Sequence, residues 1–404
     1  MNFSSSPPLT ARAANNLRKR LGMMAARAGY GRLGSIPPEM TFREWCEDLA
    51  RQGMKIDRKP FSLSDRPALI PLYDAIPTTI EEAFQRMLIV MKATQLGLTV
   101  WEMLADLYMA KKFSPVNIGM FLPDVPLADF KSQHRFLPIV ESAPSLLREL
   151  TTKVDEQGNE TKIGAGNIRT RVFGQSLLMF LWSSGGVTTE SRPMDIVSMD
   201  EVQGMTLEQI DKIRARVGDS RVQYVLMLST ANIPDADIDH WYKTGTMEVW
   251  HSRCRACGKL SDLSDPVGIF PDRSITFNSG QVPYIGAIAP PRAEYVYTCP
   301  HCAHWIPDAQ DGEYVATNPA ADPHRRSFLL PRTISPRETP RSMLANWRGA
   351  KTGDQKKSFY NRTLARPYID ANQLPVTMAM CEAAAEEGMA RPEVAQQGQG
   401  HLHG

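Results

Sequence analysis

The stretch Met87-Leu-Ile-Val-Met-Lys92-Ala-Thr-Gln-Leu-Gly97-Leu-Thr99 decides the fold class. Its first five residues form a short, continuous apolar run, which is typical of a strand that is buried on both faces. A turn that contains Gly97 follows, and residues 98–110 then carry apolar side chains at helical spacing. A buried strand, a loop and a helix in this order indicate one unit of an α/β fold.

The same alternation extends from about residue 67 to about residue 235. We expect a hairpin over 162–175. Strands are predicted over 116–122, 176–182, 194–199 and 222–228, and helices over 130–140 and 206–217. Because buried strands that alternate with helices form parallel sheets, we expect an α/β domain with a mainly parallel sheet over residues 61–245.

The loop Lys92–Thr99 occupies the position of a phosphate-binding loop, between a buried strand and the N-terminus of a helix. Backbone N–H groups and the helix dipole favour an anion there, and the hydroxyl of Thr99 is a potential Mg²⁺ ligand. The loop departs from G-x-x-x-x-G-K-[ST], because Lys92 replaces the first glycine and Leu98 replaces the lysine. It is either a phosphate loop whose cation comes from the opposite end or an ordinary structural turn.

A second strand end carries the pair Asp200-Glu201. An aspartate at the tip of a buried strand can hold Mg²⁺, and an adjacent glutamate can polarise water for attack on a γ-phosphate. The alternative is that the pair only opens a loop or caps a helix. Together with the loop, and provided that the two strand ends lie side by side, the pair favours a P-loop NTPase fold of the catalytic-glutamate type.

Four of the six cysteines form the pairs Cys254-x-x-Cys257 and Cys299-x-x-Cys302. Two such turns can present four thiolates to one tetrahedral Zn²⁺, a closed and therefore structural site. We expect a zinc-ribbon-like insertion over 246–320, with strand-like segments at 267–270, 274–277 and 295–298. A redox or disulfide role is the alternative. His251, His301 and His304 are interpreted as bystanders, and Cys46 and Cys381 as ordinary thiols.

Composition excludes several classes of protein. The 404 residues carry a net charge of +2 with 42% hydrophobic residues, as in globular proteins, and no apolar run is long enough to span a membrane. The first 38 residues hold six Lys or Arg and no acidic residue, which predicts a basic arm within the N-terminal region 1–60 or, alternatively, a transit peptide. Residues 324–366 hold eleven Lys or Arg against two acidic residues, which indicates a solvated linker or a phosphate-contacting surface.

Taken together, these motifs resemble the large terminase subunit of tailed bacteriophages, in the lambda-like branch with a deviant phosphate loop. The resemblance covers roughly residues 60 to 375. The segments that carry it are 67–75, 92–99, 191–201, 228–230, 250–258, the second cysteine pair and 359–368.

The resemblance implies a motor that hydrolyses ATP and drives double-stranded viral DNA into a procapsid in the host bacterial cytoplasm. The implied partners are a terminase small subunit and the procapsid portal, with a homo-oligomeric ring and no membrane. Its cofactors would be ATP, Mg²⁺ and structural Zn²⁺.

The resemblance also implies a role for each site residue. Nucleotide would be bound by the loop of Lys92, Gly97, Leu98 and Thr99. Mg²⁺ would be held by Thr99 and Asp200. Catalysis would rest on Lys92 and on Glu201, which activates water. Hydrolysis would be coupled to movement through Ser229 and Thr230. Family members commonly have an aromatic residue where Ala68 stands, so Tyr73 is the alternative for stacking on adenine.

Members of this family usually continue with an RNase H-like nuclease. Because only a short polar tail follows Tyr368, we expect residues 321–404 to be a basic linker and a truncated tail that supply no DNA cleavage. Two other interpretations stay open. One is a zinc-stabilised helicase or translocase of the same superfamily, and the other is a zinc adaptor that does not hydrolyse ATP.

Overall fold

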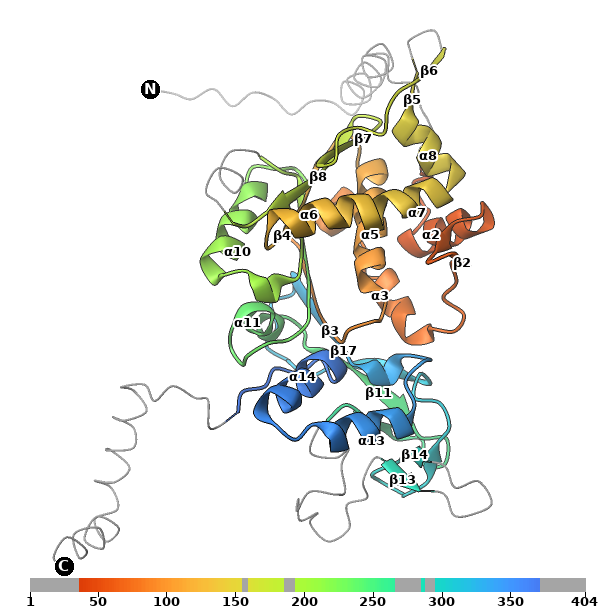
Figure 1. Ribbon diagram of the computed structural model, residues 1–404, viewed down its shortest axis with the longest axis vertical. Helices are drawn as coiled ribbons and strands as arrows, with labels where there is room; N and C mark the ends of the chain where they lie inside the picture. The colour runs from red at the N-terminus through yellow and green to blue at the C-terminus, as the bar shows by residue number, and fades with distance from the viewer. Residues whose placement is uncertain (1–35, 155–158, 185–192, 266–284, 288–294, 371–404) are drawn as a thin grey trace, which may run out of the picture. The chain divides into compact units, whose positions relative to one another are not determined.

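The computed structural model describes residues 36–154, 159–184, 193–265, 285–287 and 295–370. Figure 1 gives the labels that are used from here on. Among the described residues, no helix is both long and apolar enough to cross a membrane. The basic N-terminal residues 1–35, the tail beyond residue 370 with Cys381, and the strands expected at 267–270 and 274–277 lie outside the described residues.

A ten-stranded sheet forms the centre of the fold, in the order β12-β11-β17-β3-β10-β9-β4-β8-β7, with β16 paired to β11. Every pairing from β11 to β8 is parallel, whereas β12, β16 and β7 add antiparallel edges. The strands are β3 (Met87–Lys92), β4 (Asn117–Leu122), β7 (Thr170–Phe173), β8 (Ser176–Trp182), β9 (Ile196–Asp200), β10 (Tyr224–Ser229), β11 (Glu248–Arg253), β12 (Leu260–Ser261), β16 (Gly312–Ala316) and β17 (Arg325–Leu330). The predicted α/β fold with a mainly parallel sheet is thus confirmed.

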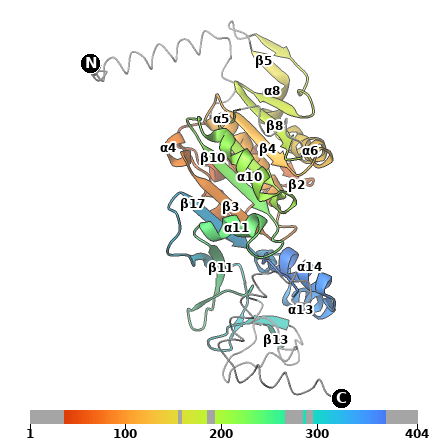
Figure 2. The same ribbon diagram turned by 90° about the vertical axis from the view of Figure 1, so that its left-hand side faces the viewer.

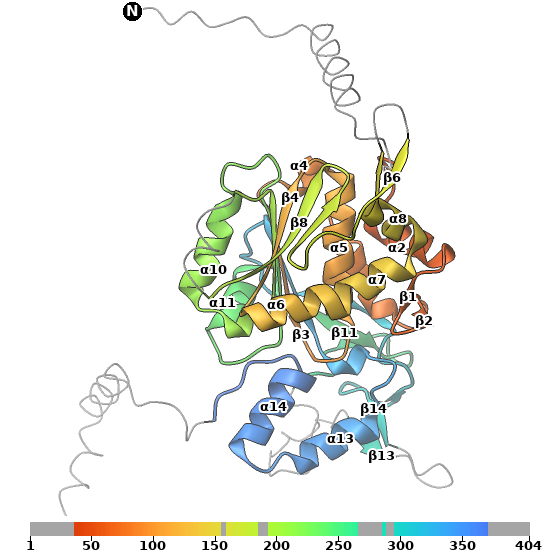
Figure 3. The same ribbon diagram turned by 45° about the horizontal axis from the view of Figure 1, so that its top comes forward.

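Helices cover both faces of this sheet. Figure 3 shows α5 (Leu98–Lys112) on one face, and α10 (Leu207–Arg214) and α11 (Asp237–Thr244) on the other. All residues of β3, β9 and β10 are buried. This double burial explains why these strands appear in the sequence as continuous apolar runs rather than as alternating ones.

The helix expected over 130–140 forms within a longer helical stretch that consists of α6 (Val125–Lys131), a π-helical segment η2 (Ser132–Phe136) and α7 (Leu137–Ser142). Another local prediction is wrong. The hairpin expected over 162–175 does not form, because β7 pairs with β8 through a two-residue turn at Gly174-Gln175. Gly174 has a φ of +59°, which suits such a tight turn. Instead β6 (Glu160–Lys162) pairs with β5 (Thr152–Val154).

The N-terminal part of the described chain packs onto α5. Helix α2 (Phe42–Arg51) begins with a capping box between Thr41 and Glu44, and its buried face contacts α5. The chain then passes through the hairpin of β1 (Lys55–Ile56) and β2 (Lys59–Pro60), and through η1 (Pro67–Leu69) and α3 (Ile70–Tyr73). The remaining short helices here are α4 (Ile80–Ala83) and α8 (Pro144–Thr151).

The sheet does not end at residue 245, so the expected domain boundary there is wrong. Strand β17 comes from the stretch expected to be a basic linker, yet it lies between β11 and β3 in the middle of the sheet. Several arginines in that stretch form ion pairs, among them Arg325 with Asp322, Arg326 with Glu248, Arg332 with Glu338 and Arg366 with Asp262. A count of charges cannot distinguish such paired residues from a solvated face.

Helices α13 (Pro340–Gly349) and α14 (Gly353–Thr363) follow β17 and pack beside a small three-stranded sheet, as Figure 2 shows. That sheet consists of β13 (Ile285–Ala287), β14 (Tyr295–Thr298) and β15 (Trp305–Ile306). The two helices and the small sheet share a second hydrophobic core, which includes Cys254, Cys299, Tyr297, Trp347 and Phe359. The cysteine-containing segment is therefore stabilised by helices that lie later in the sequence.

Candidate functional site

The phosphate-loop edge, defined here as Lys92–Thr99 together with Asp200 and Glu201, lies where β3 and β9 end. Gly97 has a φ of +84° and immediately precedes α5, whose first turn has neither a side-chain cap nor an acidic residue. The backbone N–H groups of Leu98 and Thr99 have no partner among the described residues and are therefore available to an anion. A guanidinium N–H of Arg66 donates to the carbonyl of Leu96 at 3.0 Å and holds the loop from outside.

The two unusual positions of the loop have different surroundings. Leu98 is buried in the main core, so only its backbone N–H is available to a ligand. Lys92 ends β3, and its ammonium group has no hydrogen-bond or ion-pair partner within the described part of the chain. A cation for a bound phosphate is thus available at the start of the loop and not at the usual lysine position.

The strands that carry Lys92 and Asp200 are not neighbours, so the condition that their ends lie side by side is not met by direct pairing. Strand β10 lies between β3 and β9. Helix α5 contacts both β10 and β9, and this path brings the Thr99 hydroxyl within 3.3 Å of Asp200 Oδ2. Two side-chain oxygen atoms from residues that are 101 positions apart in the sequence therefore meet at this edge of the sheet.

A lysine that the sequence did not indicate lies between these two groups. Lys131, at the end of α6, donates to Asp200 Oδ2 at 2.6 Å and to Thr99 Oγ1 at 3.3 Å. Its ammonium nitrogen is 3.9 Å from Glu201 Oε1. No local sequence signal distinguishes Lys131 from other helical lysines, because its main partner lies 69 residues further along the chain.

Glu201 adopts a left-handed backbone conformation with a φ of +58°. Such conformations are uncommon outside glycine and are concentrated at functional sites. The Gln203 side-chain amide donates to Glu201 Oε2 at 2.7 Å, and the Gln203 backbone N–H donates to Ser229 Oγ at 3.0 Å. The Ser229 hydroxyl in turn donates to the Gln203 side-chain carbonyl. Gln203, also missed from the sequence, thus connects Glu201 to the residue expected to act in coupling.

Among the described residues, the neighbouring Thr230 takes part through its backbone. Its carbonyl oxygen lies 2.9 Å from Ser229 Oγ.

A polar stripe on α5 continues behind the phosphate-loop edge. Thr99, Glu102 and Asp106 lie at helical spacing, and Asp106 accepts a hydrogen bond from Ser198 Oγ at 2.6 Å. Burial raises the pKa of Asp106 to about 7. Burial and the nearby charges of Asp200 and Asp106 raise the pKa of Glu102, whose carboxylate oxygens have no hydrogen-bond partner in the described structure.

Tyr73 is not placed to stack on a base, so that expectation is wrong. Its ring is 4% exposed and stacks on Phe42 with centroids 5.1 Å apart, inside the main core. Near Ala68 lies a different aromatic side chain, because Tyr314 Oη donates to the Ala68 carbonyl at 3.1 Å. A cavity of about 710 Å³ lies beside Tyr314 and Trp250, and no residue of the phosphate-loop edge lines it.

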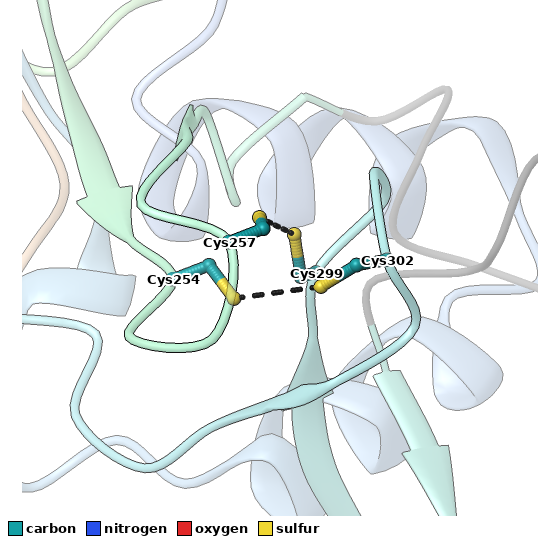
Figure 4. Close-up of side chains that lie close together, drawn as sticks. All are labelled: Cys254, Cys257, Cys299 and Cys302. Atoms are coloured by element: carbon teal, nitrogen blue, oxygen red, sulfur yellow. Dashed lines mark hydrogen bonds between the residues drawn. The ribbon is translucent and has the colours of Figure 1, made fainter.

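The four-cysteine cluster consists of Cys254, Cys257, Cys299 and Cys302, whose sulfur atoms all lie within 4.8 Å of one another (Figure 4). Sγ–Sγ distances of 3.7 Å join Cys254 to Cys302 and Cys257 to Cys299. A disulfide requires about 2.05 Å, whereas thiolates at ~2.3 Å from one tetrahedral ion lie ~3.8 Å apart. The donor set therefore fits a single metal ion.

The two buried cysteines differ in acidity. Burial opposes ionisation of Cys254, but the backbone N–H groups of Cys257 and Ala256 prevail and lower its pKa to about 7. Burial raises the pKa of Cys299 to about 12. A metal at this cluster would bind the sulfur atoms as thiolates, so its binding would release protons.

Helix α14 contacts both sites. The backbone N–H and the hydroxyl of Thr94, within the phosphate loop, donate to the Arg362 carbonyl at 2.9 and 3.2 Å. Phe359 of the same helix belongs to the second hydrophobic core, which contains Cys254 and Cys299. The phosphate loop and the four-cysteine cluster are therefore connected through one helix.

Comparison with known proteins identifies the family. No curated protein matches the chain. The large terminase ATPase domain of Thermus phage P74-26 is 13% identical and aligns over 75% of this chain and 99% of that chain, with a TM-score of 0.39. A mutant of that domain is 11% identical over 70% of this chain and 89% of that chain, with a TM-score of 0.40. The family model of the phage terminase large subunit gpA, ATPase domain, matches residues 62–318, and the chain therefore belongs to this family.

Proposed function

We propose that this chain is the ATP-hydrolysing motor of a phage terminase and that it translocates double-stranded viral DNA into a procapsid in the host bacterial cytoplasm. Family membership supports the proposal. The observation that carries it is the approach of Thr99 Oγ1 to Asp200 Oδ2, at 3.3 Å, beside an uncapped helix N-terminus. These are the oxygen ligands and the anion site that a magnesium-bound triphosphate needs.

In this proposal, Lys92 and the backbone N–H groups around Gly97, at the start of α5, bind the β- and γ-phosphates, and Gly97 allows the backbone to approach them closely. Thr99 and Asp200 hold Mg²⁺, since hydroxyl and carboxylate oxygens are ligands that this ion prefers. Bound Mg²⁺ supplies charge neutralisation on the β- and γ-phosphates. Leu98 contributes only its backbone, because its side chain is part of the core.

Glu201 is the general base of the proposed reaction. Water attacks the γ-phosphorus, the bond from that phosphorus to the bridging oxygen of ADP breaks, and the water proton passes to the Glu201 carboxylate. Gln203 orients that carboxylate by its 2.7 Å hydrogen bond. Ser229 forms hydrogen bonds with Gln203, so a change in the protonation or position of Glu201 would reach Ser229 through Gln203. Through this path Ser229 would couple hydrolysis to movement.

The four-cysteine cluster is proposed to hold a structural Zn²⁺ in a zinc-ribbon-like insertion. Four thiolates saturate a tetrahedral ion and leave no position open for catalysis. DNA contact is proposed for the exposed basic residues of α13 and α14, among them Arg341 and Arg362. The terminase small subunit, the portal and further copies of this chain in a ring are the proposed protein partners.

Steady-state ATP hydrolysis, with and without double-stranded DNA, tests the motor. We expect the wild-type chain to hydrolyse ATP, and Lys92→Ala and Glu201→Gln each to lower kcat by about 10²-fold or more. Glu208→Gln is the matched control, because Glu208 is an exposed glutamate of α10 that pairs with Lys212. Absence of turnover in the wild-type chain, despite bound zinc and DNA, would favour the non-hydrolysing adaptor instead.

A further inference from the structure

Two buried lysine–carboxylate pairs in this chain are nearly identical in geometry. Lys131 lies 2.6 Å from Asp200, and the two side chains are 9% and 0% exposed. Lys111 lies 2.6 Å from Glu149, and these side chains are 10% and 7% exposed. The second pair is an isolated ion pair between α5 and α8, whereas the first lies inside the phosphate-loop edge.

The ammonium group of Lys131 is surrounded by oxygen atoms that would suit a divalent cation. Besides Asp200 Oδ2, it contacts Thr99 Oγ1 at 3.3 Å, and Glu201 Oε1 is 3.9 Å away. Asp200 and Thr99 are the groups assigned above to magnesium. Two cations in one such position would repel each other strongly, because burial weakens screening by water.

We propose that Lys131 is a positioning residue that occupies the metal position while the nucleotide site is empty. It neutralises Asp200, holds Thr99 and Asp200 together, and withdraws when a metal–nucleotide complex binds. This inference rests on the proposed function, because it takes Thr99 and Asp200 as the ligands of magnesium.

The backbone around Lys131 favours withdrawal of the side chain alone. Asp124 caps α6, the helix that ends at Lys131, and the π-helical segment η2 begins at the next residue. Such segments are frequent at functional sites. Arg171 donates to Ser132 Oγ at 3.2 Å, and Ser132 donates to the Ile168 carbonyl, so both ends of α6 are fixed. The flexible four-carbon stem of the lysine then provides the movement.

The test measures Mn²⁺ binding to the full chain without nucleotide, by electron paramagnetic resonance, together with binding of a fluorescent ATP analogue in Mg²⁺. The proteins are wild type, Lys131→Met, Lys131→Gln and the matched control Lys111→Met. We expect both Lys131 variants to bind Mn²⁺ about tenfold or more tightly than wild type, because the internal competitor is gone. Lys131→Gln retains a hydrogen-bond donor to Asp200, so the test can still be made with this variant if Lys131→Met does not fold. The control should match wild type.

Equal Mn²⁺ affinity in wild type and in folded Lys131→Gln, while both bind the Mg²⁺–nucleotide, would overturn the inference and leave the proposed function intact. Loss of Mg²⁺–nucleotide binding in Lys131→Gln, while wild type and Lys111→Met still bind it, would also overturn the inference. Lys131 would then contact the nucleotide rather than withdraw. Absence of nucleotide binding in all four proteins would overturn the proposed function, and this inference would fall with it.

Discussion

The phosphate-loop edge and the four-cysteine cluster each gather anionic groups from distant parts of the chain, but they balance the charge differently. At the phosphate-loop edge, the chain's own Lys131 neutralises Asp200, and the surrounding strands are entirely buried. At the four-cysteine cluster, the hydrogen bonds of the sulfur atoms among the described side chains join only cysteine to cysteine. We therefore expect the first site to fold without a metal and the second to depend on one.

The strongest test of this difference is removal of a cysteine ligand. Cys257→Ala should lose bound zinc and expose the segments around the two cysteine pairs, 254–259 and 295–306, to protease, because zinc sites in small modules contribute apparent binding free energies of roughly 10–16 kcal/mol. Zinc content and limited proteolysis measure both effects. Cys46→Ala, which removes a buried thiol of the main core, should retain zinc. Retention of a full equivalent of zinc in Cys257→Ala would contradict the expectation that the four-cysteine cluster depends on a metal bound by all four sulfur atoms.

The next largest effect is expected on the free energy of unfolding when the ion pair between Lys131 and Asp200 is broken. Asp200→Asn removes the buried carboxylate that lies 2.6 Å from the Lys131 ammonium and leaves it only the more distant Glu201 carboxylate at 3.9 Å, which should lower the free energy of unfolding by about 3–5 kcal/mol. Urea denaturation measures the change. Asp211→Asn, which removes an exposed carboxylate paired with Arg214, should cost less than about 1 kcal/mol. If Asp200→Asn is as stable as the control, the phosphate-loop edge does not rely on its own cation.

The polar stripe behind that edge makes stability depend on pH. The pKa of Asp106 is about 7 in the folded chain, against an ordinary value of 3.8 for an aspartate carboxyl group, so the folded state retains a proton that the unfolded state loses. The free energy of unfolding should therefore fall as pH rises from about 4 to about 7, by up to about 4 kcal/mol from this group. Asp106→Asn should flatten the profile of denaturation midpoints over that range. An unchanged slope would show that Asp106 ionises normally.

The smallest predicted effect concerns the loop itself. Gly97→Ala places a Cβ in a left-handed conformation, 3.4 Å from the Arg66 guanidinium, and should cost roughly 1–2 kcal/mol of stability and weaken ATP binding. Gly349→Ala is the matched control, because a Cβ there meets nothing within 4 Å. Denaturation and titration with a fluorescent ATP analogue compare the two. Equal stability and equal ATP-analogue affinity in the two variants would mean that the loop does not require glycine at position 97.

Helix α14 offers a route between the two regions. It accepts hydrogen bonds from Thr94 at one end and contributes Phe359 to the core around the cysteines. This connection is absent from any pattern in the sequence, because Thr94 and Arg362 are 268 residues apart.

The sequence by itself determined the features that depend on neighbouring residues. The buried run Met87–Met91 and the helix after Gly97 identified the α/β unit, since burial on both faces produces continuous apolar strands. The two Cys-x-x-Cys turns predicted a four-sulfur site, because such a short turn brings its two sulfur atoms together in almost any fold.

Only the tertiary structure decided which distant segments became neighbours. It inserted β10 between β3 and β9, placed β17 in the middle of the sheet, and buried Tyr73 against Phe42. It also brought Lys131 to Asp200, a contact that depends on two strands, one helix and their packing at once. Local propensity carries no information on such contacts, because each residue of the pair has an ordinary sequence environment and the interaction exists only after the sheet and its helices have assembled.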